Sequence, residues 1–344
     1  MRERGPKLRE TLITLAHGAG GKATRMLIEQ VFLEAFENPA LRPLSDAALL
    51  DHDGVRLAFT TDSSVVKPIF FPGGDIGDLA VNGTVNDLAV SGARPLALSA
   101  GFVIEEGFLV DDLRRVAASM AAAASRVGVP LATGDTKVVE RGKADGLYIT
   151  TAGVGVMSAG VELGADRVAR GDRLLVSGSI GDHGMAVVVA RGELALEADL
   201  ESDTAPVHEL AAALGEGLGG GLRWMRDPTR GGLATALNEL AGDAGVAVWL
   251  DEEALPVRPV VAGTCEILGI DPLYVASEGR LVAIVAPDAA ERALEILRSH
   301  PQGADAAVIG EVRDEPEGLV FLDTALGGGR VVDMLVGDPL PRIC

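Results

Sequence analysis

The first half of the chain alternates between amphipathic stretches and short apolar runs, a pattern that predicts one α+β unit. Apolar residues at helical spacing predict helices over 22–37, 74–92 and 111–127. Apolar runs bounded by glycine, proline and polar residues predict strands over 55–66, 94–104, 130–140 and 146–157. Because the last two strands follow each other without a helix, this order favours an α+β sheet over a doubly wound parallel sheet.

The second half has its own run of elements, which begins after a predicted turn at residues 170–172. Strands are expected over 173–177, 246–250, 281–286, 306–313 and 318–322. Helices are expected over 184–191, 204–218, 230–244, 259–268 and 288–299. The chain is therefore predicted to form domains over 1–160 and 168–326, followed by a flexible tail over 327–344. Pro339 and Pro341 are expected to stiffen the end of that tail.

Composition narrows the classes of function. The chain has 344 residues, of which 48% are hydrophobic, and a net charge of −20. Such an acidic chain is a poor match for nucleic acid or an anionic membrane surface, which both attract basic proteins. It contains no apolar stretch of about 20 residues and no apolar leader. Two cysteines give no disulfide framework, so a reducing, cytoplasmic compartment is expected.

A glycine-rich loop, AHGAGGKA at residues 16–23, opens the first predicted helix. It departs from a Walker A loop, because Ala16 replaces the first glycine and Ala23 the Ser/Thr. It still offers backbone N–H groups and a lysine at a helix start, which suits a phosphate. The alternative is a flexible turn. The candidate phosphate-binding residues are His17, Gly18, Gly20, Gly21 and Lys22.

Several aspartates lie at the predicted ends of strands and helices. Asp87 is unusual, because it lies beside Asn86 in an otherwise apolar helix, where a carboxylate is unfavourable unless it is paired or holds a cation. Carboxylates commonly hold Mg²⁺ against phosphates. The candidate metal ligands are Asp62, Asp87, Asp135 and Asp227, with Asp75 and Asp78 as further candidates. Each is alternatively a solvated or capping residue; Asp227 is expected to be the N-cap of the helix that follows it.

Three further residues attract attention individually. Lys137 follows Asp135 on a predicted strand, and Glu278 lies in a predicted turn before a strand; each alone is more often a surface residue. Cys344 is the last residue, and it is either a chance residue at a chain end or a thiol carried on an arm. Cys265 has apolar neighbours at helical spacing, so it is expected in the core.

Taken together, these segments resemble the HypE family of hydrogenase maturation factors. The resemblance rests on HGAGGKA, TTDSSVVKPIFFPGGDIGDLAVNGTVNDLAVSGARP, GDTKVV, RDPTRGGLA, SEGRLV and the terminal PRIC, in that order. It implies a two-domain fold like that of aminoimidazole ribonucleotide synthetase (PurM), with a ferredoxin-like C-terminal domain. It also implies a homodimer through the N-terminal domains, ATP with Mg²⁺, and the partners HypF and the HypC–HypD complex.

The resemblance also implies roles for the candidate residues. Cys344 would accept a carbamoyl group, and ATP would drive its dehydration to a thiocyanate that supplies the cyanide ligand of hydrogenase iron. The four aspartates would hold Mg²⁺, with Asn86, Asp227 and the glycine-rich loop around the nucleotide. Glu278, expected to be ionised, would be the base, with Lys137 beside it. Two alternatives stay open: another ATP-dependent kinase or synthetase of the superfamily, and a thiol carrier without catalysis.

Overall fold

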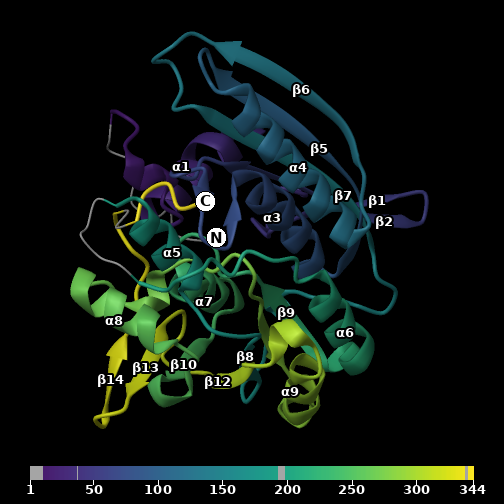
Figure 1. Cartoon of the computed structure of the whole chain (residues 1–344). Helices are drawn as coiled ribbons and strands as arrows, with labels where there is room; N and C mark the ends of the chain where they lie inside the picture. Colours follow the sequence, from purple (N-terminus) through teal and green to yellow (C-terminus); the bar gives the residue numbers. More distant parts are fainter. Residues whose placement is uncertain (1–10, 37, 193–197, 338–339) are drawn as a thin grey trace.

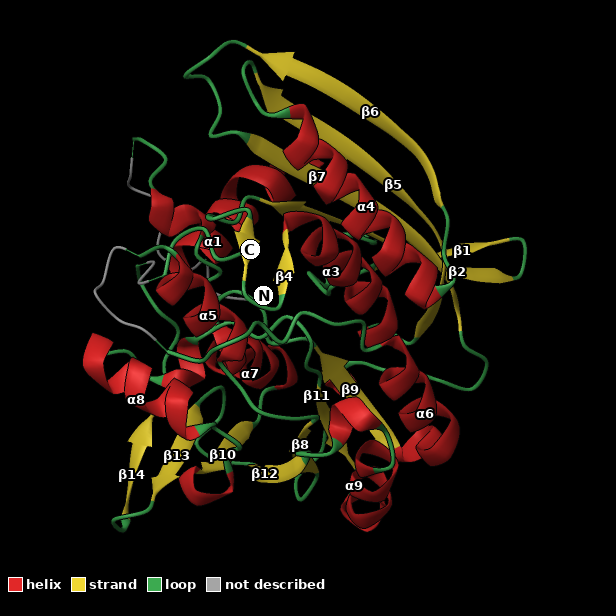
Figure 2. Ribbon diagram, in the orientation of Figure 1, coloured by secondary structure: helices red, strands yellow, loops and turns green. Residues whose placement is uncertain are grey.

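Two β-sheets organise the computed structural model, which describes residues 11–36, 38–192, 198–337 and 340–344 (Figure 1). The predictions for residues 1–10, for residue 37 and for Pro339 lie outside the described residues. Helices cover the sheets and fill the space between them, as the ribbon shows (Figure 2). The predicted α+β class is confirmed.

The first sheet has the order β1-β2-β7-β5-β6, and all its neighbours are antiparallel except β5 and β6. Its strands are β1 (Ala48–His52), β2 (Val55–Ser64), β5 (Ala93–Glu105), β6 (Leu131–Val139) and β7 (Leu147–Met157). Helices α3 (Ile76–Val90) and α4 (Val110–Val127) lie on one face, and α4 makes the crossover that a parallel β5–β6 pair requires.

The opposite face and the β6 edge of this sheet stay open. Phe59 of β2, Val103 of β5 and Val138 of β6 are 48%, 37% and 68% exposed. Every residue of β6 before Val139 is exposed. In Figure 1 this strand forms the outer border of the molecule. Since β6 pairs only with β5 among the described strands, its other edge has free backbone groups.

The second sheet has the order β14-β13-β10-β12-β8-β11-β9 and is antiparallel except for β10 and β13. Its strands are β8 (Arg173–Val176), β9 (Leu222–Arg226), β10 (Ala247–Asp251), β11 (Val282–Val285), β12 (Ala307–Arg313), β13 (Val320–Thr324) and β14 (Gly328–Val331). Its helices are α5 (Asp182–Ala190), α6 (His208–Leu218), α7 (Gly232–Ala244), α8 (Pro259–Leu268) and α9 (Ala290–Arg298).

Shorter elements complete the fold. Helices α1 (Lys22–Leu27) and α2 (Leu33–Phe36) flank a π-helical segment, Ile28–Phe32, so the predicted first helix is present with a local irregularity. Strands β3 (Phe70–Phe71) and β4 (Gly74–Asp75) form a small hairpin before α3.

Helix α3 lies at the centre of the molecule, and all its described side chains except that of Asp87 are buried. Small residues let the helix approach its neighbours closely. A Cβ added at Gly83 would lie 2.8 Å from Oδ2 of Asp62, and one at Gly77 would lie 2.6 Å from the carbonyl oxygen of Val116 on α4. Close packing of α3 therefore brings the Asp62 carboxylate of β2 against the helix.

Two local predictions need correction. The N-cap of α7 is Gly231, so Asp227 is not a helix cap. The tail predicted to be flexible from residue 327 begins with an ordered strand, because β14 pairs with β13 at the edge of the second sheet.

Candidate active site

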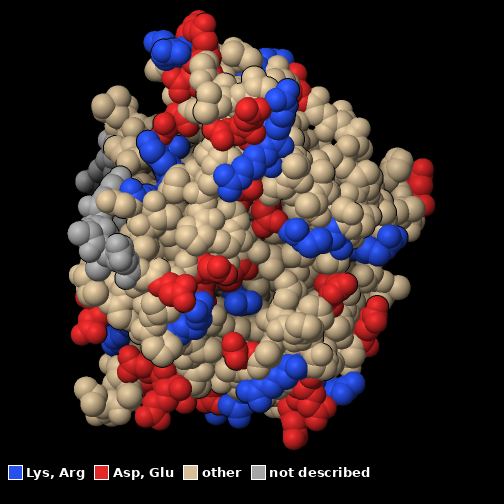
Figure 3. Space-filling model, in the orientation of Figure 1, with Lys and Arg blue, Asp and Glu red and all other residues tan. Residues whose placement is uncertain are grey.

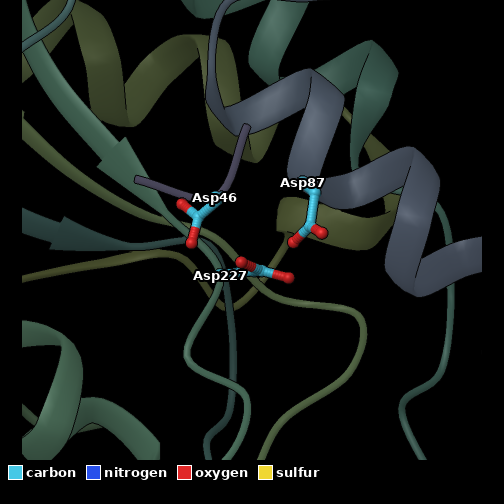
Figure 4. A group of neighbouring side chains, drawn as sticks. All are labelled: Asp46, Asp87 and Asp227. Atoms are coloured by element: carbon cyan, nitrogen blue, oxygen red, sulfur yellow. The ribbon is translucent and has the colours of Figure 1, made fainter. Parts of the chain in front are cut away.

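Three carboxylates from separate parts of the chain meet beside α3. Asp46 precedes β1, Asp87 lies on α3, and Asp227 directly follows β9; one oxygen of each lies within 4.8 Å of the others (Figure 4). The Thr60 hydroxyl of β2 lies 2.8 Å from Oδ2 of Asp87 and 2.7 Å from the carbonyl oxygen of Asp46. It thereby holds the first two segments together. We call Asp46, Asp87 and Asp227 the acidic cluster.

Burial raises the pKa of all three carboxyl groups, and for Asp87 and Asp227 the negative charge of neighbouring carboxylates adds to the effect. The pKa of Asp227 is raised to about 8, by burial first and then by Asp46. The pKa of Asp87 is raised well above its ordinary value, by burial and then by Asp227 and Asp46. Oδ2 of Asp227 is buried without a hydrogen-bond partner among the described residues. A bound cation would relieve both the repulsion and the unpaired oxygen.

Arg226, the last residue of β9, supplies positive charge on one side of the cluster. It lies 3.0 Å from Asp46 and 3.0 Å from Glu239 of α7, and its side chain is 22% exposed. Its charge opposes the burial effect on the pKa of Asp46. Since both partners of Arg226 are negative, one guanidinium does not neutralise the cluster as a whole. The remaining carboxylate oxygens therefore fit a divalent cation such as Mg²⁺.

Glu278 lies beside this cluster, on the loop before β11. Its backbone N–H donates to Oδ1 of Asp203 at 3.0 Å, and its carbonyl oxygen accepts from Nδ2 of Asn86 at 3.1 Å. The side chain is 3% exposed, and Oε1 has no hydrogen-bond partner in the described part of the chain. The peptide of Glu278 is thus fixed on both sides, while one carboxyl oxygen stays available to a reactant.

The Asn86 amide binds the backbone of the second half of the chain. Nδ2 donates to Glu278 and to the carbonyl oxygen of Ala205 at 3.1 Å each, and Oδ1 accepts from the N–H of Val207 at 2.8 Å. These three backbone contacts engage both ends of the amide. They favour a role for Asn86 in positioning Glu278 over the predicted direct contact with a nucleotide.

Burial raises the pKa of Glu278 well above its ordinary value. Negative charge on Asp62 and Asp227 raises it further, and Arg230 opposes the shift. Burial and the neighbouring negative charge therefore act against the ionised form of Glu278 that the sequence analysis expects. Positive charge entering beside Asp62 and Asp227 would lower the pKa of Glu278 and allow it to accept a proton.

The glycine-rich loop contacts the end of the chain. The backbone N–H of Lys22 donates to the carbonyl oxygen of Leu335 at 3.0 Å, and its Nζ lies 2.6 Å from Asp333. A Cβ at Gly21 would lie 2.2 Å from the Leu335 oxygen. A Cβ at Gly20, where φ is +79°, would lie 2.8 Å from the carbonyl oxygen of Arg230. These two glycines are thus needed for close backbone approach, and phosphate binding by the loop stays a prediction.

His17 and Gly18 lie next to the same loop. Nδ1 of His17 accepts from the Thr14 N–H at 3.1 Å, and its Nε2 is buried without a partner among the described residues. The Gly18 carbonyl oxygen accepts from Nη1 of Arg230 at 3.0 Å. Gly18, Arg230 and Cys344 share the lining of a cavity of about 150 Å³.

The last five residues, Leu340 to Cys344, lie against the segment that follows β2, and we call them the arm. The N–H of Val65 donates to the Cys344 oxygen and the N–H of Lys67 to the Arg342 oxygen, both at 3.1 Å. Leu340 and Ile343 are 6% and 4% exposed and belong to the core beneath α3. Val65 directly follows β2, the strand that carries Asp62, and Cys344 lines the cavity that Gly18 and Arg230 also line, so the docked arm lies against both of these parts of the chain.

Asp135 and Lys137 do not join this group. They pair with each other at 2.7 Å on β6, and their side chains are 70% and 68% exposed. Asp62 on β2 is separated from β6 by β7 and β5. Three strand spacings of about 4.8 Å each place the two strands roughly 14 Å apart. Within one chain, Asp135 therefore cannot share a metal ion with Asp62.

The remaining candidates have structural roles. Asp75 is the N-cap of α3, since its carboxylate accepts from the N–H groups of Gly77 and Asp78. Asp78 pairs with Arg126 of α4. Cys265 is 1% exposed, and burial raises its pKa to about 11, so the prediction of a core thiol agrees with its position.

Sequence reasoning missed Asp46, Arg230 and Asp203. Asp46 and Asp203 each lie in a short Ser-Asp pair that looks like ordinary turn chemistry. Arg230 lies within the RDPTRGG segment, directly before two glycines. This pair of glycines is the one signal in the sequence that a charged side chain lies at a tight turn. Only the fold brings them to Glu278 and Cys344.

Charges are otherwise distributed in small groups. On the face shown in Figure 3, acidic and basic side chains lie interspersed over both halves of the molecule (Figure 3). Within the described ranges, none of the helices has the length and apolar character needed to span a bilayer.

Comparisons with known proteins agree with this geometry. The family model "AIR synthase related protein, N-terminal domain" matches residues 44–157, and its C-terminal counterpart matches residues 169–323. The chain is 53% identical to carbamoyl dehydratase HypE of Bradyrhizobium diazoefficiens, over 98% of this chain and 97% of that protein. These matches cover both sheets and the site between them.

Two solved structures are also similar. One is a HypE–HypF complex, whose matching chain is 50% identical with a TM-score of 0.85, covering 90% of this chain and 99% of that one. The other is hydrogenase maturation protein HypE in complex with ATP, 48% identical with a TM-score of 0.81, covering 97% of this chain and 100% of that one.

Proposed function

The chain belongs to the HypE family of carbamoyl dehydratases, within the AIR synthase related proteins, and on that premise we propose that it matures [NiFe] hydrogenase by dehydrating a carbamoyl group on its own Cys344. The observation that carries this function is the docked arm, because it places Cys344 in the lining of a cavity that Gly18 and Arg230 also line. A kinase or synthetase of the same fold would have no use for such an arm.

Mg²⁺ and ATP are the cofactors of the proposed reaction. Asp46, Asp87 and Asp227 would hold Mg²⁺, with Asp62 next to them; the unpaired Asp227 oxygen supports this assignment. Gly18, Lys22 and His17 would contact the nucleotide once the Asp333–Leu335 segment moves away from the loop. A related HypE has been solved with ATP. When bound, ATP supplies the phosphoryl group that turns the carboxamide oxygen into a leaving group.

The residues of the chain then perform proton transfer and orientation. Conversion of –S–C(=O)–NH₂ to –S–C≡N breaks the C–O bond and removes both amide protons. Glu278 would take one proton through its unpaired Oε1, and the other would leave with the departing oxygen as part of the released phosphate. Arg230, between Gly18 and Glu278, stabilises negative charge that develops on the departing oxygen. The carbamoyl group would come from HypF, since a HypE–HypF complex exists in the family, and the product would go to the iron-bearing HypC–HypD complex.

A homodimer explains why Asp135 and Lys137 face solvent. The uncovered face of the first sheet carries exposed apolar side chains such as Phe59 and Val103, and the β6 edge is open. Packing this face against a second copy would bury it. We propose that Lys137 and Asp135 of one subunit then complete the site of the other.

A mixed dimer tests this arrangement. One subunit carries Lys137→Ala and the other Glu278→Gln, with different affinity tags so that the heterodimer alone is purified. If the site is shared, one of its two sites is intact, and we expect about half of the wild-type rate per dimer. If Lys137 acts within its own chain, each subunit keeps a defect and the heterodimer is as inactive as either parent dimer.

Intact mass spectrometry tests the function itself. With a carbamoyl donor system, we expect the C-terminal peptide to gain one carbamoyl group, and addition of ATP and Mg²⁺ to remove one water from it. A carbamoylated peptide that ATP leaves unchanged would indicate the thiol-carrier alternative. Nucleotide turnover without any carbamoyl group on the arm would indicate a kinase or synthetase.

A further inference from the structure

Backbone carbonyl groups of the arm bind two residues that lie at the two ends of α5. His183 in the first turn lies with Nε2 2.6 Å from the carbonyl oxygen of Ile343. Arg191, directly after the last turn, donates from Nη2 to the Arg342 oxygen at 2.9 Å and to the Pro341 oxygen. Three consecutive carbonyl groups of the arm thus bind one helix.

The protonation of His183 follows from its partners. A carbonyl oxygen only accepts, so Nε2 carries the hydrogen and Nδ1 is the acceptor. Ser202 Oγ lies 2.7 Å from Nδ1 and also accepts from the Thr204 N–H at 3.1 Å, so the serine hydroxyl donates to the ring. Phe71 packs edge-on against the imidazole at 5.5 Å. The donor that faces the arm is therefore fixed in direction.

Further contacts hold both α5 and the arm against the segment that follows β2. Arg191 Nε donates to the Lys67 oxygen at 2.9 Å, which ties α5 to the segment that pairs with the arm. Arg342 has φ of +58°, an unfavourable conformation for a side chain with a Cβ, and one that persists only when the surroundings hold it. Arg342 pairs with Asp145, and its Nε donates to the Val65 oxygen at 3.0 Å.

We propose that His183 and Arg191 are positioning residues that seat the arm and so place the Cys344 thiol for dehydration. The catalytic effect of this positioning rests on the proposed function, whereas the binding of the arm by these two residues does not. The cavity of about 150 Å³ beside the seated thiol is large enough for the loaded form. A carbamoyl group has three non-hydrogen atoms, which need roughly 90 Å³ at about 30 Å³ for each water-sized group.

Alkylation of Cys344 by iodoacetamide, followed by peptide mass spectrometry, tests the seat without any catalysis. We expect about tenfold faster alkylation in His183→Leu and in Arg191→Met, equivalent to about 1.4 kcal/mol. His183→Gln keeps an N–H donor and should restore slow alkylation. Arg298→Met is the matched control, because Arg298 also ends a helix and donates to a backbone oxygen, that of Ala306, outside the arm contacts. Cys265 alkylation and the unfolding midpoint report whether each variant is folded.

A second measurement distinguishes a role in positioning the thiol for reaction from a role that only holds the arm against the protein. In a single turnover of carbamoylated protein, His183→Leu and Arg191→Met should slow dehydration about tenfold while carbamoyl loading continues. Unchanged Cys344 alkylation in folded Arg191→Met would show that Arg191 does not hold the arm in place. Faster alkylation with an unchanged dehydration rate would overturn the positioning role. If the wild-type protein never dehydrates the carbamoyl group, the proposed function fails. The alkylation result still shows whether His183 and Arg191 hold the arm.

Discussion

Replacing Cys344 with serine is expected to abolish carbamoyl modification and the ATP turnover that depends on it, while the fold stays intact. The thiol is the acceptor atom, and an alcohol at ordinary pKa is a far weaker nucleophile. The fold should tolerate the change, because the arm is seated through Leu340, Ile343 and backbone contacts. Intact mass spectrometry after incubation with the carbamoyl donor measures the loss.

Cys265 provides the internal control for that experiment. It is buried and its pKa is raised to about 11, so its thiolate is scarce at neutral pH. We expect no adduct on Cys265 in the Cys344→Ser variant. A carbamoyl adduct there would show that the arm is not the specific acceptor, and unchanged modification in the variant would remove the basis of the proposed function.

Glu278→Gln is expected to reduce dehydration by about 10²- to 10⁴-fold, the usual contribution of a general base, with ATP binding retained. Glutamine keeps the shape and leaves the Asp203 and Asn86 contacts to the backbone of residue 278 in place. It cannot accept the amide proton. Single-turnover dehydration of pre-carbamoylated protein, with nucleotide binding measured in parallel, separates the two effects.

The pH dependence of that reaction provides a second check on Glu278. Its pKa is raised by burial and by Asp62 and Asp227, so the base form is scarce at low pH and increases as pH rises. The wild-type rate should therefore increase with pH through a raised pKa. Mg²⁺ beside the acidic carboxylates should move this rise to lower pH. A wild-type profile that matches that of Glu278→Gln in shape would assign the proton transfer to another group.

The repetitive parts of the fold were predictable because their patterns are local. Helices α3 and α4 and strands β2, β5, β6 and β7 follow apolar periodicity that is visible in the sequence. Strand β9, whose sequence LRWMR carries arginines, and strand β14, whose sequence GGRV lacks any period, become strands only because neighbouring strands pair with them. Tertiary pairing of this kind leaves no local signal.

The site was predictable only in part, for a similar reason. Asp87 stands out because a carboxylate in an apolar helix requires a partner. Asp46 has no such context, and its role arises when β2 and β9 bring residues 46, 87 and 227 together. The sequence drew attention to Glu278 and Cys344, but their roles were inferred only through the family resemblance. Their local sequence does not predict the contacts with Asp203 and Asn86 that hold the glutamate. It also does not predict the contacts with α5 that hold the arm.

The anchoring of the arm to β14 has a kinetic consequence. From Val332, which donates to Val320, the chain has 12 residues to Cys344, a span of up to about 40 Å at roughly 3.3 Å per residue. A reactant on a tether of this length experiences an effective concentration on the order of millimolar at its own site. Dehydration is then a first-order process whose rate per loaded molecule does not depend on the enzyme concentration in the cell. The flux of cyanide ligand would instead be set by the second-order encounters that load the thiol and unload it.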